Sequence, residues 1–183
     1  MRSLLAAALI ALTPAAPGAT VLVPIGFREL VTTAPIIAHG HVVDVQAGWS
    51  AGRLAVETFV SLHVDDYLKG DLGSDITVRV PGGRLGRYRT FMVGAPVFRA
   101  GEEVVLFLNP GAPFYPSIVG LSQGAFRVVS MPGSSAPMVT PPAVMSVPGP
   151  NPQPVIRGDA ARRPVPIDQF RAIVRQVLAE GGR

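Results

Sequence analysis

The chain contains no cysteine among its 183 residues. Disulfides, iron–sulfur clusters and cysteine-bound zinc are therefore excluded, as is a lipid anchor attached to an N-terminal cysteine. Lysine is nearly absent, since Lys69 is the only lysine among the 16 basic residues. Charged side chains make up only 15% of the chain and form no long run, so we expect no nucleic-acid partner despite the net charge of +4.

The chain also lacks an apolar run long enough to cross a membrane, which takes about 20 residues. Its N-terminal run, Leu4 to Leu12, has nine residues, and Thr13-Pro14 and a group of small residues follow it. This layout predicts a signal peptide over residues 1–19, cleaved after Gly18 or Ala19. The protein would then be secreted or periplasmic, with no transmembrane segment after cleavage. A buried N-terminal helix or a retained anchor is the alternative.

The residues that remain after cleavage suit a single domain with its own core. Residues 20–130 show short apolar or alternating segments separated by turns rich in Gly and Pro, which is typical of strands. The predicted strands cover residues 36–45, 55–67, 76–80, 88–93, 103–108, 117–121 and 125–129. Residues 103–108 are the most apolar and are expected at the centre of the sheet, and the last two strands are expected to pair. The fold class is therefore mainly β, a barrel or a sandwich.

Helices are predicted at two places. Residues 26–33 favour a short helix, with apolar residues at positions i, i+3 and i+4. Residues 168–180 favour an amphipathic helix with an acid in its first turn and glycines after its last. The apolar stripe of this C-terminal helix needs a surface, either the β domain of the same chain or a partner or membrane.

Residues 131–155 are rich in Pro, Ser and Gly and predict an extended linker, because such a segment buries little apolar surface. The chain is therefore divided into four parts. These are a signal peptide (1–19), a β-barrel domain (20–130), a Pro-rich linker (131–165) and a C-terminal helix (166–183).

The segment from Gly120 to Gly124 matches the G-x-S-x-G pattern of a nucleophilic serine. That chemistry needs a helix after Ser122 and a histidine later in the chain. The residues after Gly124 are β-like, and no histidine follows His63. We therefore expect a tight turn between strands, with Ser122 and Gln123 as candidate binding residues.

The pattern His39-Gly40-His41 places two imidazoles on the same side of a predicted strand. Together with a third ligand they could hold a metal ion, so both are candidate metal ligands. The third ligand would come from His63, Asp44 or Asp65. The alternative is a pair of histidines at the rim of an edge strand, and no other motif indicates a cofactor.

A basic and aromatic cluster is formed by Arg84, Arg87, Tyr88 and Arg89. Clusters of this kind occur in proteins that bind nucleic acids. This chain has a single lysine and a predicted signal peptide, so we expect an anionic ligand other than nucleic acid. We keep these four residues as candidate binding residues for an acidic partner or an anionic surface.

Four segments in the middle of the chain resemble, in this order, a family of exported bacterial proteins of unknown function. They are VDDYLKG (64–70), ITVRVPGG (76–83), GAPVFRAGEEVVLF (94–107) and VGLSQGAFRV (119–128). The layout is also remotely similar to the netrin and tissue-inhibitor-of-metalloprotease modules. This resemblance implies a small antiparallel OB-like barrel of five to seven strands, with the short N-terminal and the C-terminal amphipathic helices beside it. Those inhibitors act through an N-terminal cysteine that this chain lacks, so no functional residue is transferred.

No motif completes a catalytic set, so the sequence favours a non-enzymatic binding module. Its expected partner is another exported protein, with an exported protease as one option. A metal-binding protein or a metal-dependent enzyme that uses His39 and His41 is the alternative function.

Overall fold

The computed structural model describes residues 25–111, 115–142 and 164–181, which form a mainly β fold with two helices. The helices are α1 (Phe27–Thr33) and α2 (Ile167–Gly181), and η1 (Ala51–Arg53) and η2 (Leu121–Gly124) are short 3-10 turns. The strands are β1 (Ile36–Trp49), β2 (Val56–Lys69), β3 (Asp75–Pro81), β4 (Gly83–Leu85), β5 (Tyr88–Thr90), β6 (Glu103–Asn109), β7 (Ser117–Ile118), β8 (Ala125–Val129), β9 (Met138–Thr140) and β10 (Val165–Pro166). The predicted signal peptide lies outside the described residues.

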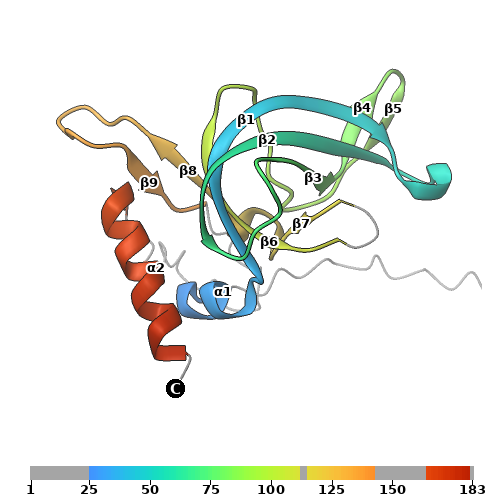
Figure 1. The fold of residues 1–183 in the computed structure, drawn as a ribbon. Coiled ribbons are helices and arrows are strands. Elements are labelled where there is room, and N and C mark those ends of the chain that lie inside the picture. The colour runs from blue at the N-terminus through green and yellow to red at the C-terminus, as the bar shows by residue number, and fades with distance from the viewer. Residues whose placement is uncertain (1–24, 112–114, 143–163, 182–183) are drawn as a thin grey trace, which may run out of the picture.

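Eight strands form one large mixed sheet in the order β1-β2-β3-β7-β6-β8-β9-β10, and β4 pairs with β5 in a separate hairpin. The sheet curls, because β6 also pairs with β1 (Figure 1). The mainly β class is as predicted, but the sheet is mixed and is not a clean antiparallel barrel. One pairing, β3 with β7, is parallel and rests on Arg79 and Ser117 alone, and β8 to β10 extend the sheet beyond the curl.

The two longest strands, β1 and β2, form an antiparallel arc that spans the molecule (Figure 1). The register of this pair shifts at three places, two of which lie between His39 and Gly40 and between Val42 and Asp44. Such bulges bend a strand. Gly40 lies against β2 so closely that a Cβ there would be 2.1 Å from the carbonyl oxygen of His63. The bend therefore depends on a residue without a side chain.

Strand β6 is central, as its apolar sequence predicts, and both of its faces are buried. Val104, Leu106 and Leu108 point into the core inside the curled sheet. Val105 and Phe107 belong to a second core between the sheet and the helices. Because side chains alternate along a strand, a continuous apolar run is what a strand with two covered faces requires.

Both predicted helices are present, and they pack together on the second core. The rings of Phe27 on α1 and Phe170 on α2 meet at a centroid distance of 5.6 Å, and each also contacts Phe126 of β8. The apolar stripe of α2 therefore covers the β domain of its own chain. Within the described residues, no helix has the length and apolar character needed to cross a membrane.

Two predictions about the second half of the chain need correction. Residues 117–121 and 125–129 do not pair, because β7 and β8 both pair with the same edge of β6 at different positions. The predicted linker also contains β9 and the first residue of β10, which pair with each other, and β9 pairs with β8 as well. Val139 of β9 is fully buried in the second core, so this short segment has enough apolar contact to stay on the sheet.

Candidate functional site

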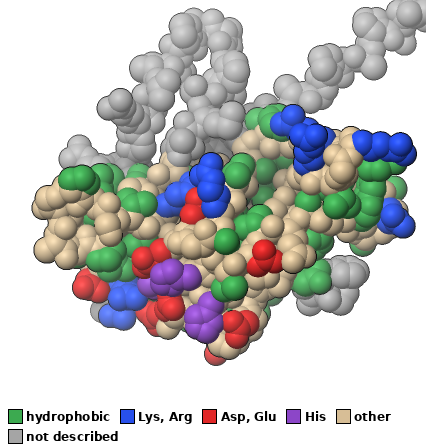
Figure 2. All heavy atoms as spheres, turned by 90° about the horizontal axis from the view of Figure 1, so that it is seen from above, with side chains coloured by type: hydrophobic (Ala, Val, Ile, Leu, Met, Phe, Trp, Pro, Cys, Tyr) green, Lys and Arg blue, Asp and Glu red, His purple; other side chains and the backbone are tan. Residues whose placement is uncertain are grey.

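Charged side chains gather in two places on the face shown in Figure 2, where arginines lie at one end and histidines with carboxylates lie nearer the other. The arginine group comes from the β4–β5 hairpin and from the turn between β1 and β2. We call this end the hairpin tip, defined by residues 49–54 and 84–91. It includes four of the predicted binding residues, Arg84, Arg87, Tyr88 and Arg89.

The hairpin tip is built by turns that depend on glycine. Gly86 begins the two-residue turn between β4 and β5 with a φ of 58°, a conformation that side chains disfavour. The η1 turn has two consecutive residues with positive φ, Gly52 at 75° and Arg53 at 56°. Left-handed backbone is uncommon for a residue such as arginine, and it directs Arg53 back over the end of β1.

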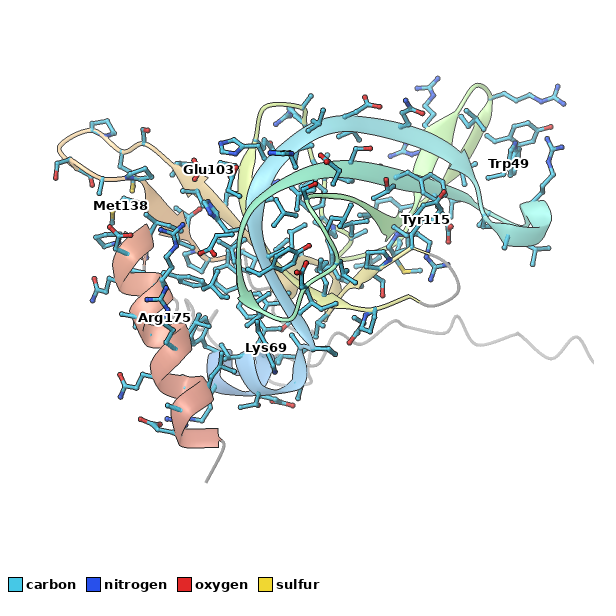
Figure 3. The ribbon with its side chains drawn as sticks, viewed as in Figure 1. Trp49, Lys69, Glu103, Tyr115, Met138 and Arg175 are labelled. Atoms are coloured by element: carbon cyan, nitrogen blue, oxygen red, sulfur yellow. The ribbon has the colours of Figure 1, made fainter. Side chains whose placement is uncertain are left out.

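Four side chains of the hairpin tip contact one another in a row, which includes the Trp49 labelled in Figure 3. The guanidinium of Arg53 lies 5.5 Å from the ring centroid of Trp49, and the rings of Trp49 and Tyr88 meet edge to face at 5.0 Å. Arg87 lies 5.1 Å from the Tyr88 ring and donates a 2.9 Å hydrogen bond to its hydroxyl. Cation–π contacts hold these arginines in place and leave their charge unneutralised.

The arginines of the hairpin tip have no acidic partner in the part of the chain that the structure describes. Arg53, Arg84, Arg87 and Arg89 are exposed, and none of them forms an ion pair with a described residue. Five arginines elsewhere differ, since Arg28, Arg79, Arg99, Arg127 and Arg171 each lie within 4 Å of a carboxylate. Lys69 donates instead to two backbone carbonyls, and Arg175 is a single exposed cation on α2. A local excess of positive charge at one end attracts acidic ligands.

Large apolar side chains are exposed beside the four arginines. Leu54 is 90% exposed at the η1 turn, and Phe91, which follows β5, is 74% exposed. The two segments are adjacent, because the Val56 amide donates a 2.8 Å hydrogen bond to the Thr90 hydroxyl. Exposed apolar side chains next to unpaired cations are characteristic of a surface that binds another molecule.

A groove of about 310 Å³ runs beside the hairpin tip. Its buried lining includes Val80 and Phe98, and its exposed lining includes Phe91 and Val97, which is 71% exposed. Arg89 is its only charged lining residue. A second hollow of about 360 Å³ lies on the other side of the 91–96 segment and reaches Ser122.

Ser122 and Gln123 lie in the η2 turn, and neither lines the groove that contains Arg89. The Ser122 amide donates a 2.9 Å hydrogen bond to Gly94, while Gln123 is buried and its Oε1 accepts from the amide of Ile25. No histidine lines the hollow beside Ser122. Gln123 therefore ties the start of the described chain to the sheet, and only Ser122 remains accessible from a hollow.

His39 and His41 both lie against Glu103 of β6. The Nε2 atom of His39 is 2.8 Å from one oxygen of Glu103, and Nε2 of His41 is 3.9 Å from the other. Arg171 of α2 donates to Nδ1 of His39 at 3.3 Å, so both ring nitrogens of this buried residue are occupied. No described group of three histidine or acidic side chains has the arrangement needed to hold a metal ion.

The third histidine, His63, forms an exposed pair with Asp75 on the next strand, at 2.9 Å. This hydrogen bond, together with the nearby negative charge, raises the pKa of His63 above its ordinary value of 6.5. The bonds from His63 and Ser74 lower the pKa of Asp75 below 3.8. Each histidine of the chain thus has a carboxylate partner, and none lines a hollow described above.

We compared the chain with protein-family models, with curated proteins and with solved structures, and none of the three comparisons found a match.

Part of the hairpin tip was not predicted. Trp49, Arg53 and Leu54 are absent from the predicted binding residues, because they are distant from the Arg84–Arg89 cluster in sequence. Phe91 is also absent, because it falls within the predicted strand 88–93. The run GWSAGRL (48–54) indicates a binding surface, since it places the lone tryptophan and an arginine at a turn expected on the surface. Only the fold brings this turn beside the β4–β5 hairpin.

Proposed function

We propose that this chain is an exported, non-enzymatic binding module that holds a protein partner at the hairpin tip. The observation that supports this most is the row from Arg53 through Trp49 and Tyr88 to Arg87. Both arginines are exposed and form no ion pair with a described residue. Arginine, tyrosine and tryptophan dominate the binding energy of protein interfaces. Stacked in a row, these side chains are ordered before binding, so they lose little further conformational entropy when a partner binds.

The arrangement favours binding over catalysis. The hollow beside Ser122 has no histidine to act as its base, and the histidines are held by carboxylates elsewhere. A nucleophilic serine needs a base within hydrogen-bond reach.

The proposed fold relationship is an OB-like barrel distantly related to netrin-type modules. The pairings β1–β2, β2–β3, β3–β7, β7–β6 and β6–β1 form a ring of five strands, which supports this proposal. The similarity to protease inhibitors makes an exported protease one candidate partner.

Site-specific crosslinking in the exporting cell tests the proposed function. The chain has no cysteine, so Leu54→Cys creates a single attachment point for a photoreactive maleimide on the hairpin tip. We expect a crosslinked protein of defined mass, detected by gel shift and identified by mass spectrometry.

The matched control is Leu72→Cys, at another exposed apolar position, in the loop between β2 and β3. Equal crosslinking from both positions would show random encounter. A tip probe that captures no protein would rule out the proposed function.

Metal binding through His39 and His41 is the alternative, and the geometry supports it less. A metal on His39 would have to displace Glu103 or Arg171, and the guanidinium of Arg171 repels a cation. Elemental analysis of the purified protein, with His41→Ala as control, measures whether a metal is bound and whether His41 is needed to bind it. A stoichiometric metal that is lost in His41→Ala would favour the alternative.

A further inference from the structure

One edge of β1 has no partner strand along its second half. The pairing with β6 covers only Ile36 to His41, and the bonds of Val42 with Gly101 and Glu102 are the last on that edge. Residues 44–49 pair with β2 on the other edge only, and no described strand pairs with them on this edge. Alternate residues of a strand point their amide and carbonyl groups to opposite edges. About half of the backbone groups of residues 44–49 therefore lack a partner strand.

The groove described above begins where this pairing ends. Val45 of β1 lines it, together with the 95–98 segment that leads to Gly101. Thr58 of β2 and Val80 of β3 also line the groove, and exposed Phe91 and Val97 lie along it. Val45 is the one residue of the open half of β1 among its lining residues, so the open edge begins at the groove. An extended chain fits such a site, because it can pair with the edge and place alternate side chains in the groove.

The charge around the groove indicates which residues the bound extended segment should contain. Arg89 lines the groove, and Arg53, Arg84 and Arg87 lie in the adjoining turns without acidic partners. Asp44 is the only acid in the open half of β1, and the side-chain amide of Gln46 donates to it at 2.6 Å. Positive charge therefore predominates along the path.

We propose that the groove accepts an extended acidic segment of the partner protein, which adds as a strand to the open edge of β1. Apolar side chains of the segment face Val45, Val80 and Val97, and its carboxylates face the arginines of the hairpin tip. This inference rests on the proposed function and specifies the chemistry of the partner.

A synthetic peptide tests the proposal directly. The probe is a capped octapeptide that alternates valine with aspartate, labelled with a fluorophore and titrated with the full chain by fluorescence anisotropy. We expect saturable binding that weakens as salt increases. The same peptide with lysine in place of aspartate should not bind, and equal binding of both peptides would overturn the proposal.

N-methylated peptides test strand addition. An added strand uses the amides of alternate residues only, so methylation of one set should reduce affinity about tenfold or more, while methylation of the other set is tolerated. Equal affinity of the two methylated peptides would show that the groove does not bind by strand pairing.

Variants of the chain locate the binding site. Arg84→Gln with Arg89→Gln should weaken peptide binding about fivefold, as expected for two exposed ion pairs. The control removes the same charge from the helical end, by Arg28→Gln with Arg175→Gln, and should leave affinity unchanged. Val97→Asp should also weaken binding, since this exposed substitution places a carboxylate in the groove without disturbing the core, whereas Leu72→Asp should not.

Two further outcomes would overturn the inference. They are no peptide binding at millimolar concentration, and arginine-dependent binding to phosphatidylglycerol vesicles that the peptide does not compete with. If the Leu54→Cys probe still captures a protein in either case, only this inference fails and the proposed function stands. If it captures none, both fail.

Discussion

His63 and Asp75 form an exposed ion pair between β2 and β3, and both pKa values are shifted in the direction that favours the charged pair. A raised histidine pKa contributes stability below pH 6.5, and this contribution is lost as pH rises through the pKa of the folded state. A lowered aspartate pKa contributes stability above pH 3.8, and this contribution is lost as pH falls through the folded-state pKa. The pair therefore stabilises the fold mainly between pH 3.8 and pH 6.5.

Asp75→Asn is expected to lower the pKa of His63 toward its ordinary value, because the hydrogen-bonded carboxylate is gone. NMR titration of the histidine ring protons measures this change. The difference in urea midpoint between the native chain and Asp75→Asn should be largest between pH 3.8 and pH 6.5 and should vanish by about pH 9. A midpoint difference that does not vary with pH would contradict the assigned pair.

At the scale of the element, β1 determines how the sheet curls. Its first half pairs on both edges with β2 and β6, whereas its second half pairs with β2 alone. The same strand thus closes the sheet at one end and provides an open edge at the other. Gly40 lies in the closed half, where the backbone of β2 leaves no room for a Cβ.

Gly40→Ala is expected to destabilise the fold by at least about 2 kcal/mol, because the new methyl group would clash with main-chain atoms that cannot rotate away. Chemical denaturation measures the loss. Gly181→Ala is the control, since a Cβ there makes only an ordinary 3.5 Å contact with Thr32, and it should be neutral or slightly stabilising. Equal stability of both variants would show that β1 and β2 can separate at Gly40 without cost.

At the scale of the molecule, two cores share the strands β1 and β6. The helices cover one end of the β1–β2 arc, and the hairpin tip occupies the other end, where Trp49 lies (Figure 3). Because both cores use the same strands, we expect them to unfold together.

Phe170→Ala tests this coupling, because it removes a buried ring from the helical end and should cost about 3–5 kcal/mol. Trp49 is the only tryptophan, so its fluorescence reports the hairpin tip, while far-UV circular dichroism reports the whole fold. Both transitions should shift equally to lower denaturant. A shift in circular dichroism with unchanged Trp49 fluorescence would mean that the two ends unfold independently. Arg175→Ala, on the exposed face of α2, should shift neither.

The candidate site was predicted in part. The Arg84–Arg89 cluster is contiguous in sequence, and the structure exposes it on one hairpin. Trp49, Arg53 and Leu54 join it only because β1 and β2 are long enough to carry their turn to the same end. The second half of β1 is only partly buried, so its residues do not alternate between apolar and polar. The hydrophobic pattern therefore does not show how far this strand extends.

The sequence by itself determined the mainly β class, the two helices, the central place of residues 103–108 and the exclusion of cysteine chemistry. These follow from local periodicity and composition, which each segment carries alone. Only the tertiary structure decided that β7 and β8 both pair with β6, that Val139 draws part of the Pro-rich segment onto the sheet, and that half of β1 has an open edge. Strand partners are chosen by contacts between residues far apart in the chain, and a single sequence does not show which of many compatible pairings buries the most apolar surface.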